Sequence, residues 1–346
     1  MQSRTLSVDN IPSTSIHSRR ITPPLFDWFF IITGGLLFAL PFVLMMGEQR
    51  LARGDIIRWY FWMNALISSP HVYATYVRLQ RKINEEKVSV HLGFPAYFLI
   101  VGLLYGASHF HYLIEAMTII NVWQSFHYLR QTYGVGCLYG HYNKIDNTMI
   151  NLRYWAYHLP MPALMFGRWD TIYEAWGGKT YSFKPVHFNE HFMLVMWGIA
   201  AVGILIGLYG EYRNFRRNDS AYNPVTLINY LVFFGIHAYG FVVLSHFQRG
   251  FFSVTIFHAV QYLALVWILE RKTAIEKGGS WYPKLPNILG FAAFWSILFI
   301  LGYGYEQKVT VALNNYWIEA STILLASVSA HHYFVDAFIW RKKTGP

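Results

Sequence analysis

Long apolar stretches separated by short polar segments recur along the whole chain. A membrane-spanning helix needs about 20 consecutive, mostly apolar residues, and ten stretches of roughly that length are present. They cover residues 26–46, 56–79, 93–113, 114–138, 150–168, 191–210, 224–247, 250–270, 285–305 and 311–340. We therefore predict an all-α, polytopic integral membrane helix bundle with about ten transmembrane helices.

The chain is expected to form one membrane domain preceded by a polar segment. Residues 1–25 are polar, contain three prolines and lack the small-residue cleavage site of a signal peptide, so we expect a retained cytoplasmic tail. Residues 26–346 show no internal repeat, which predicts a single transmembrane helical domain. The third and fourth stretches are almost contiguous, and a re-entrant hairpin is an alternative there.

The distribution of basic residues predicts the orientation. If the N-terminus is cytoplasmic, the cytoplasmic segments receive most of the 28 lysines and arginines. Such an excess is typical of cytoplasmic loops. We therefore predict that both termini are cytoplasmic and that the protein lies in a bacterial inner membrane.

Composition agrees with this assignment and narrows the possible partners. Only 13% of residues are charged, against roughly 25% in soluble domains. The net charge of +10 comes from basic residues between apolar stretches, so we expect the lipid bilayer as a partner and no nucleic acid. The single cysteine, Cys137, excludes an internal disulfide and any multi-cysteine metal site.

The histidines fall at a common depth. Of the 15 histidines, seven are placed near the bilayer midplane when each predicted helix is centred and given about 1.5 Å per residue. They are His71, His127, His158, His237, His258, His331 and His332. A single buried histidine would be read as a packing residue, but ionisable groups inside spans are costly and usually paired or functional. We therefore predict a shared metal site.

The last apolar stretch carries the densest candidate ligands. His332 and Asp336 are four residues apart and share one helix face, so both can reach the same site, while His331 could reach a neighbouring ion. Asp336 has a second interpretation, in which it lies at the inner helix end and pairs with Arg341 or Lys342.

Two more histidines are candidate ligands only if the chain bends. His109 and His111 are two residues apart, so a regular helix cannot direct both side chains at one ion. An irregular segment that lines a cavity could do so.

Polar partners accompany the midplane histidines. Gln131 follows His127 by four residues and could orient its ring, the usual role of a residue that supports a metal ligand. Gln261 shares a face with His258 in the same way. Arg130 needs an anionic partner inside the membrane, and either Asp336 or a substrate head group could supply it.

This donor set favours a transition metal. Neutral imidazole binds iron, zinc, copper and manganese, and carboxylates favour harder ions. The number of candidate histidines predicts two or three ions. We expect iron, with manganese, copper and zinc left open.

Four segments resemble a known class of enzymes. "SPHVYATYVRL", "FHYLRQTYGV", "FHAVQYLALVW" and "AHHYFVDAFIWR" are similar to signature segments of histidine-rich integral-membrane non-haem iron enzymes, which include bacterial carotenoid-cleaving dioxygenases and membrane desaturases and hydroxylases. The histidine boxes of desaturases are absent as a set.

The resemblance implies an oxidoreductase that activates dioxygen at a multinuclear iron site, supplied where necessary by an electron donor. It also implies that the enzyme oxidises or cleaves a lipid-soluble substrate such as a fatty aldehyde, an acyl chain or a carotenoid.

Two other functions stay open at the level of sequence. A haem protein would use histidine pairs as axial ligands and would leave most midplane histidines unexplained. A metal-ion or proton transporter would be lined by the same histidines, although such proteins often show inverted repeats, and none is found here.

Overall fold

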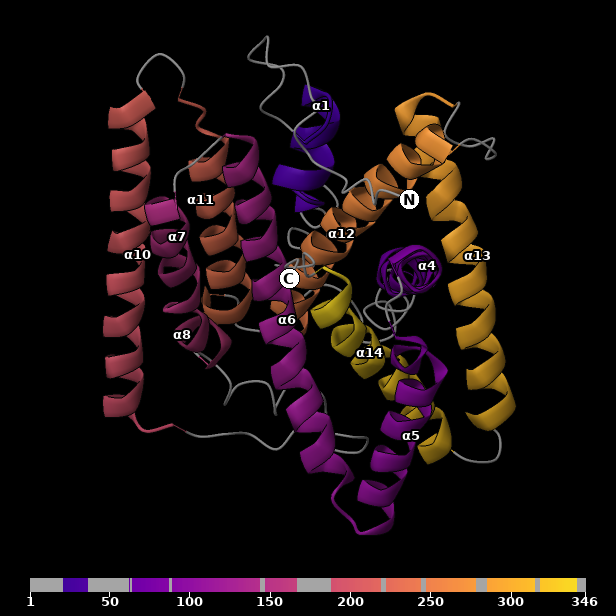
Figure 1. Cartoon of the computed structure of the whole chain (residues 1–346). Helices are drawn as coiled ribbons and strands as arrows, with labels where there is room; N and C mark the ends of the chain where they lie inside the picture. The colour runs from indigo at the N-terminus through magenta and orange to yellow at the C-terminus, as the bar shows by residue number, and fades with distance from the viewer. Residues whose placement is uncertain are drawn as a thin grey trace, which may run out of the picture.

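A computed structural model describes residues 21–36, 62, 64–86, 89–143, 147–166, 188–218, 222–243, 247–277, 285–314 and 318–340. Every regular element in these ranges is helical and none is a strand, so the predicted all-α helical bundle is confirmed. Figure 1 shows α12 crossing the middle of the bundle, with α10 at one side and α13 at the other.

Eight long helices make up most of the described chain. They are α4 (Ser69–Glu86), α5 (Phe94–His109), α6 (Leu113–Tyr142), α10 (Glu190–Asn218), α11 (Val225–Ala238), α12 (Phe247–Lys277), α13 (Asn287–Asn314) and α14 (Ile318–Ile339). Shorter helices are α1 (Pro24–Phe26), α7 (Asn147–His158) and α8 (Met161–Phe166). Single turns of other helix types occur at Asp27–Ile32, Asn64–Ser68, Val90–Leu92 and Tyr239–Val243.

α12 is the central helix of the bundle. Its residues from Ser253 to Val266 are all buried, and Trp267 is 1% exposed. A helix that is apolar on all sides is stable only when other helices surround it. The polar residues that α12 carries in this region therefore lie in the interior of the protein.

Six helices in the described ranges are long and apolar enough to cross a membrane: Val90–His109, Glu190–Arg217, Val225–Val243, Ser253–Glu276, Ile288–Tyr305 and Thr322–Ile339. On α5 and α10 most of the apolar side chains are exposed, including Phe94, Leu103, Leu194 and Leu205. A soluble protein rarely exposes continuous apolar faces of this length. Both findings fit the predicted integral membrane protein.

The other predicted spans have different outcomes. Residues 37–46 of the first lie outside the described residues. The stretch 150–168 contains two short helices, α7 and α8, separated at Leu159–Pro160, because proline disrupts a continuing helix. Where the third and fourth predicted spans meet, the chain forms two helices, α5 and α6, with His111 at φ 65 in the turn between them.

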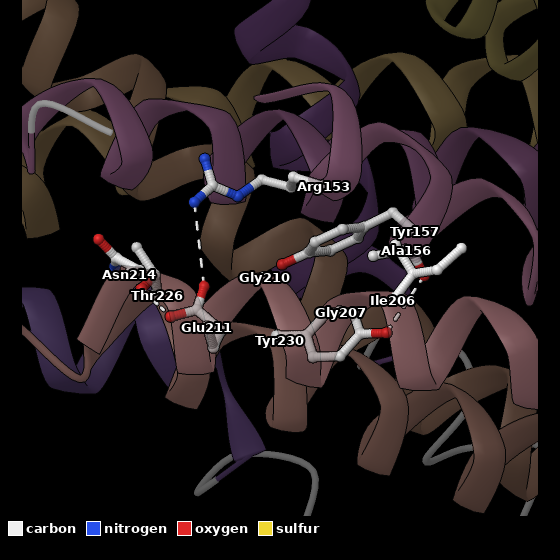
Figure 2. A pocket seen from close by; sticks show the side chains of 10 residues that line it. All are labelled: Arg153, Ala156, Tyr157, Ile206, Gly207, Gly210, Glu211, Asn214, Thr226 and Tyr230. Carbon is white, nitrogen blue, oxygen red and sulfur yellow. Dashed lines mark hydrogen bonds and ion pairs between the residues drawn. The ribbon is translucent and has the colours of Figure 1, made fainter. Parts of the chain in front are cut away.

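α7, α10 and α11 form one side of the bundle, and their contact contains a polar pocket (Figure 2). Glu211 accepts a hydrogen bond from Thr226 at 2.8 Å and lies 3.9 Å from Arg153. Tyr222 also donates to Glu211. The pKa of Tyr222 is raised, mainly by burial and in addition by the negative charge of Glu211. The polar groups are thus paired across the three helices.

Candidate metal centre

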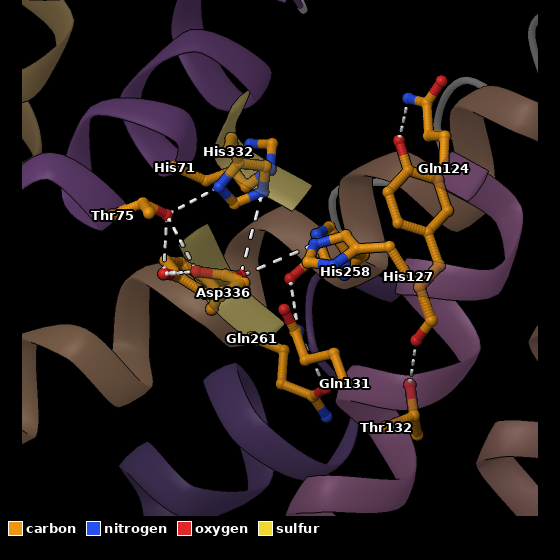
Figure 3. Close-up of polar contacts among 12 residues, drawn as sticks. His71, Thr75, Gln124, His127, Gln131, Thr132, His258, Gln261, His332 and Asp336 are labelled. Atoms are coloured by element: carbon orange, nitrogen blue, oxygen red, sulfur yellow. Dashed lines mark hydrogen bonds and ion pairs between the residues drawn. The ribbon is translucent and has the colours of Figure 1, made fainter. Parts of the chain in front are cut away.

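Four helices each contribute one histidine to a compact group in the interior. His71 from α4, His127 from α6, His258 from α12 and His332 from α14 are 8% exposed or less, and we call them the four-histidine cluster. The ring centroids are 5.1 Å apart for His71 and His258 and 4.8 Å apart for the pairs His71–His332, His127–His258 and His127–His332. Figure 3 shows these rings with Asp336 beside them.

The cluster includes two overlapping sets of possible metal ligands. One set is His71, His258 and His332, and the other is His127, His332 and Asp336. Within each set the possible ligand atoms all lie within 4.8 Å of one another, and all five side chains are buried. Side-chain groups that could hold a metal ion are therefore present, as the common depth of the histidines predicted.

Hydrogen bonds fix which ring nitrogen of His71 faces the cluster. Its Nδ1 donates to the backbone carbonyl of Ser68, one turn earlier in the chain. Its Nε2 is buried and has no hydrogen-bond partner. An imidazole that donates from one nitrogen and leaves the other bare is in the form that binds a metal.

A chain of hydroxyl groups fixes His332 in the same way. His332 Nδ1 lies 2.6 Å from Thr75 Oγ1, and Thr75 Oγ1 lies 2.6 Å from the Tyr262 hydroxyl. Tyr262 donates its proton to Asp336 Oδ1 at 2.7 Å. Because each hydroxyl has one proton to give, Thr75 donates to Tyr262 and His332 Nδ1 donates to Thr75. The Nε2 of His332 is then bare, and no partner satisfies it.

Asp336 divides its two oxygens between this chain and the cluster. Oδ1 accepts from Tyr262 and also lies 3.3 Å from Thr75 Oγ1. Oδ2 lies 3.6 Å from His127 Nε2 and 4.0 Å from His332 Nε2. The carboxylate therefore presents one oxygen to the same space as the histidines. Arg341 and Lys342, its alternative partners, lie outside the described residues.

His258 is the least satisfied member of the cluster. Its side chain is fully buried, and neither Nδ1 nor Nε2 has a hydrogen-bond partner. A buried polar atom without a partner costs about 1–3 kcal/mol, and polar groups in natural interiors are rarely left in this state. A metal ion would satisfy the bare nitrogens of His71, His258 and His332, so these residues fit a metal site.

Each cluster histidine has a polar residue four positions later on the same helix face. The pairs are His71–Thr75, His127–Gln131, His258–Tyr262 and His332–Asp336. Thr75 and Tyr262 were not predicted from the sequence, although their spacing is the same as that of His332 and Asp336. This repeated spacing was the available signal. It places a layer of hydrogen-bonding groups one turn away from the histidines.

Gln131 and Gln261 donate hydrogen bonds to backbone carbonyls, and among the described residues neither forms a hydrogen bond with an imidazole. Gln131 donates to the carbonyl of His258 at 2.9 Å and to Gln261 Oε1 at 3.2 Å. Gln261 donates to the carbonyl of Ile31 at 2.7 Å. Gln131 thus links α6 to the backbone of α12 at His258. It does not orient the ring of His127, as we had expected.

His331 has both ring nitrogens occupied. Nε2 donates to the carbonyl of Leu92 at 2.7 Å, and Nδ1 accepts from the hydroxyl of Tyr76 at 3.2 Å. No nitrogen of this ring is left for a metal. The adjacent His332 is in the cluster because successive residues point about 100° apart around a helix.

Three further predicted ligands lie outside the cluster. His109 and His111 are exposed at the end of α5 and in the turn that follows. His237 is fully buried, donates from Nδ1 to the carbonyl of Phe233 at 2.7 Å, and has an unpartnered Nε2. Its ring therefore has the form of a ligand but belongs to neither set of adjacent donors among the described residues.

Arg130 and His158 contact each other and are not part of the cluster. Arg130 Nη1 lies 2.7 Å from His158 Nε2, and His158 Nδ1 donates to the carbonyl of Tyr154 at 2.7 Å. Asp336 is therefore not the partner that Arg130 was predicted to need.

Comparison with known proteins gave no relative. No family model matches the chain, and neither a curated protein nor a solved structure is significantly similar to it.

Proposed function

We propose that this protein is a membrane-embedded, metal-dependent oxidoreductase. In this proposal the four-histidine cluster and Asp336 bind iron, and the enzyme uses dioxygen to oxidise or cleave a lipid-soluble substrate. The observation that carries the proposal is the convergence of unpartnered nitrogens from His71, His258 and His332 in a buried space that Asp336 Oδ2 also faces.

The metal-ligating atoms of the cluster favour fewer metal ions than the two or three that the sequence predicted. His332 has one bare nitrogen, because Thr75 occupies the other, and so it can complete only one of the two ligand sets. The cluster offers five donor atoms, and a protein-bound transition metal takes about four to six ligands. We therefore propose one iron, or two that share the cluster with solvent or substrate. Manganese, copper and zinc are tested in the same experiment.

The protein residues have separate roles in this proposal. The metal would supply the binding and reduction of dioxygen. Thr75 and Tyr262 keep the proton of His332 on Nδ1, so that the bare Nε2 faces the cluster. They also hold the carboxylate of Asp336 in place. The same chain of hydroxyls leads from His332 to Asp336 and can carry a proton between them. The rings of Tyr128 and Tyr333 pack against His258 and His127, and in this proposal they limit the access of water to the cluster.

A bilayer location agrees with a lipid-soluble substrate, since such a molecule can reach the bundle without passing through water. Fatty aldehydes, acyl chains and carotenoids are the substrate classes that the sequence resemblance implies. We also propose a bacterial inner membrane with both termini cytoplasmic, from the distribution of lysine and arginine, and a separate electron donor where the reaction needs reducing equivalents.

The proposal is tested by metal analysis of the purified protein. We expect at least one equivalent of iron per chain in the wild type and a large loss in His71→Ala and His258→Ala. His141→Ala is the matched control, because His141 is exposed at the end of α6. Less than one equivalent of any transition metal in well-folded wild type would contradict the proposal.

Activity assays separate the enzyme from the two alternatives. We expect oxygen consumption that depends on both the metal and one of the three substrate classes. A Soret band in the purified protein would favour haem. Metal-dependent uptake into vesicles without oxygen consumption would favour a transporter.

A further inference from the structure

Arg130 is a charged side chain near the middle of the 30-residue helix α6, and the metal site does not use it. Its side chain is exposed on the outside of the described bundle. A charge at this position in a membrane helix is costly, and such residues are usually paired or functional.

The partner of Arg130 is neutral. His158 donates from Nδ1 to the carbonyl of Tyr154, so its Nε2 carries no proton and accepts from Arg130 at 2.7 Å. The guanidinium keeps its positive charge, and no carboxylate forms an ion pair with it among the residues that the structure describes. One of its N–H groups is used by His158, and the others have no acceptor in that set of residues.

Aromatic rings surround the two side chains. The guanidinium lies over the ring of Tyr133, 5.5 Å from its centroid, and the ring of Tyr154 stacks on His158 at 4.0 Å. Tyr154 and Trp155 are 42% and 52% exposed, so they line the outer side of this position. The result is a positive group with free donors, set among aromatic side chains on the outside of the described bundle.

Arg130 is also close in depth to the metal centre. It follows His127 by three residues, which is a rise of about 4.5 Å along the helix. A head group bound at Arg130 would therefore lie within about one helical turn of the height of His127 along α6. In the predicted span 114–138 Arg130 lies near the middle of the bilayer, whereas phospholipid head groups lie at the membrane surface.

We propose that Arg130 and His158 bind the carboxylate of a long-chain fatty acid. The planar guanidinium matches a carboxylate in shape and can donate two parallel hydrogen bonds to it. This inference rests on the proposed function in one respect: the bound acid is the substrate of the oxidoreductase. It favours a single-chain carboxylate over a carotenoid, which has no anionic head.

Binding can be measured without turnover. Dibrominated stearic acid quenches tryptophan fluorescence on contact, and Trp155 lies next to Tyr154 in α7. The full chain in nanodiscs of zwitterionic lipid is titrated with this acid and with its methyl ester. Arg130→Gln and Arg130→Lys are compared with Arg213→Gln, a matched control in which the arginine also lies over a tyrosine ring, 5.9 Å from the centroid of Tyr209.

We expect Arg130→Gln to weaken binding of the acid by about tenfold to a hundredfold, as for the loss of a charged hydrogen-bond pair. Arg130→Lys should fall between it and the wild type, and Arg213→Gln should match the wild type. The ester should bind weakly to all of them, and Trp155→Phe should remove the Arg130-dependent quenching. Unchanged binding of the acid to Arg130→Gln, or equal binding of ester and acid, would overturn the proposal.

Two controls separate this inference from others. Brominated phosphatidylglycerol should give no Arg130-dependent quenching, and if it does, the site binds phospholipid anions and the fatty-acid proposal is wrong. Metal content is measured on the same samples and should be equal in Arg130→Gln and wild type. If the protein contains no metal but still binds the acid in a way that depends on Arg130, the proposed oxidoreductase function is wrong. The proposed fatty-acid site is then still supported.

Discussion

Replacement of Thr75 by valine tests whether the hydroxyl chain prepares His332 for metal binding. Thr75 is fully buried, and its Oγ1 lies 2.6 Å from His332 Nδ1, 2.6 Å from the Tyr262 hydroxyl and 3.3 Å from Asp336 Oδ1. Valine has nearly the same shape as threonine but cannot accept or donate a hydrogen bond. The substitution therefore removes the hydroxyl and leaves the packing almost unchanged.

The expected magnitude follows from these contacts. In Thr75→Val the Nδ1–H of His332 is buried without an acceptor, which costs about 1–3 kcal/mol. The ring can avoid this cost by moving its proton to Nε2, but it then loses the nitrogen that faces the cluster. Loss of a residue that supports a metal ligand typically lowers metal affinity by about 10–100-fold, or roughly 1.4–2.8 kcal/mol. The two estimates agree, so we expect a drop of that size.

The affinity is measured by titrating metal-free protein with Fe²⁺ or Co²⁺ in the presence of a competing chelator. Thr132→Val is the matched control, because Thr132 is also fully buried but donates only to the carbonyl of Tyr128 in its own helix, at 3.2 Å (Figure 3). The control should keep the affinity of the wild type. Unchanged affinity in Thr75→Val, or an equal loss in both variants, would refute the reasoning.

Two other predictions compare neighbouring positions. His332→Asn should lose bound metal, whereas His331→Asn should retain the metal and lower the thermal stability. The reason is that both ring nitrogens of His331 form hydrogen bonds between helical segments. Metal content and melting temperature measure the two effects. In α10, a Cβ on Gly207 would lie 2.4 Å from the ring of Tyr230, while none of the described atoms lies within 4 Å of one on Gly198. Gly207→Ala should therefore destabilise the protein by about 1–3 kcal/mol, and Gly198→Ala should leave it unchanged or stabilise it by up to about 1 kcal/mol, in chemical denaturation; equal effects would contradict the packing argument.

The rotation of a helix about its own axis explains why neighbouring candidate ligands point to different places in the structure. His331 and His332 are adjacent and have the same depth, and the sequence favoured both equally. In α14, His332 points toward His71 and His127, while His331 points toward Leu92 and Tyr76. The depth of a residue can be calculated from its position in a helix, but its direction depends on which neighbours the helix packs against.

Arg130 and His158 are a second example of side chains whose depth, but not direction, could be predicted from the sequence. Their depth suggested a common site with Asp336, and the structure places them together on an exposed face of α6 and α7. The short helix α7 ends at His158 because Pro160 follows, and Nδ1 of His158 donates to the carbonyl of Tyr154 one turn earlier. A prediction of one long span at 150–168 could not include that detail.

By itself, the sequence determined the helical class, the membrane character and the existence of a buried group of histidines. These properties follow from hydrophobic length and from the cost of placing an ionisable group in an apolar medium, and both are local quantities. Only the tertiary structure decided that His71, His127, His258 and His332 meet and that Thr75 and Tyr262 join Asp336 behind them. That choice depends on the rotation and contact of four helices, which are set by packing over the whole bundle and not by any one segment.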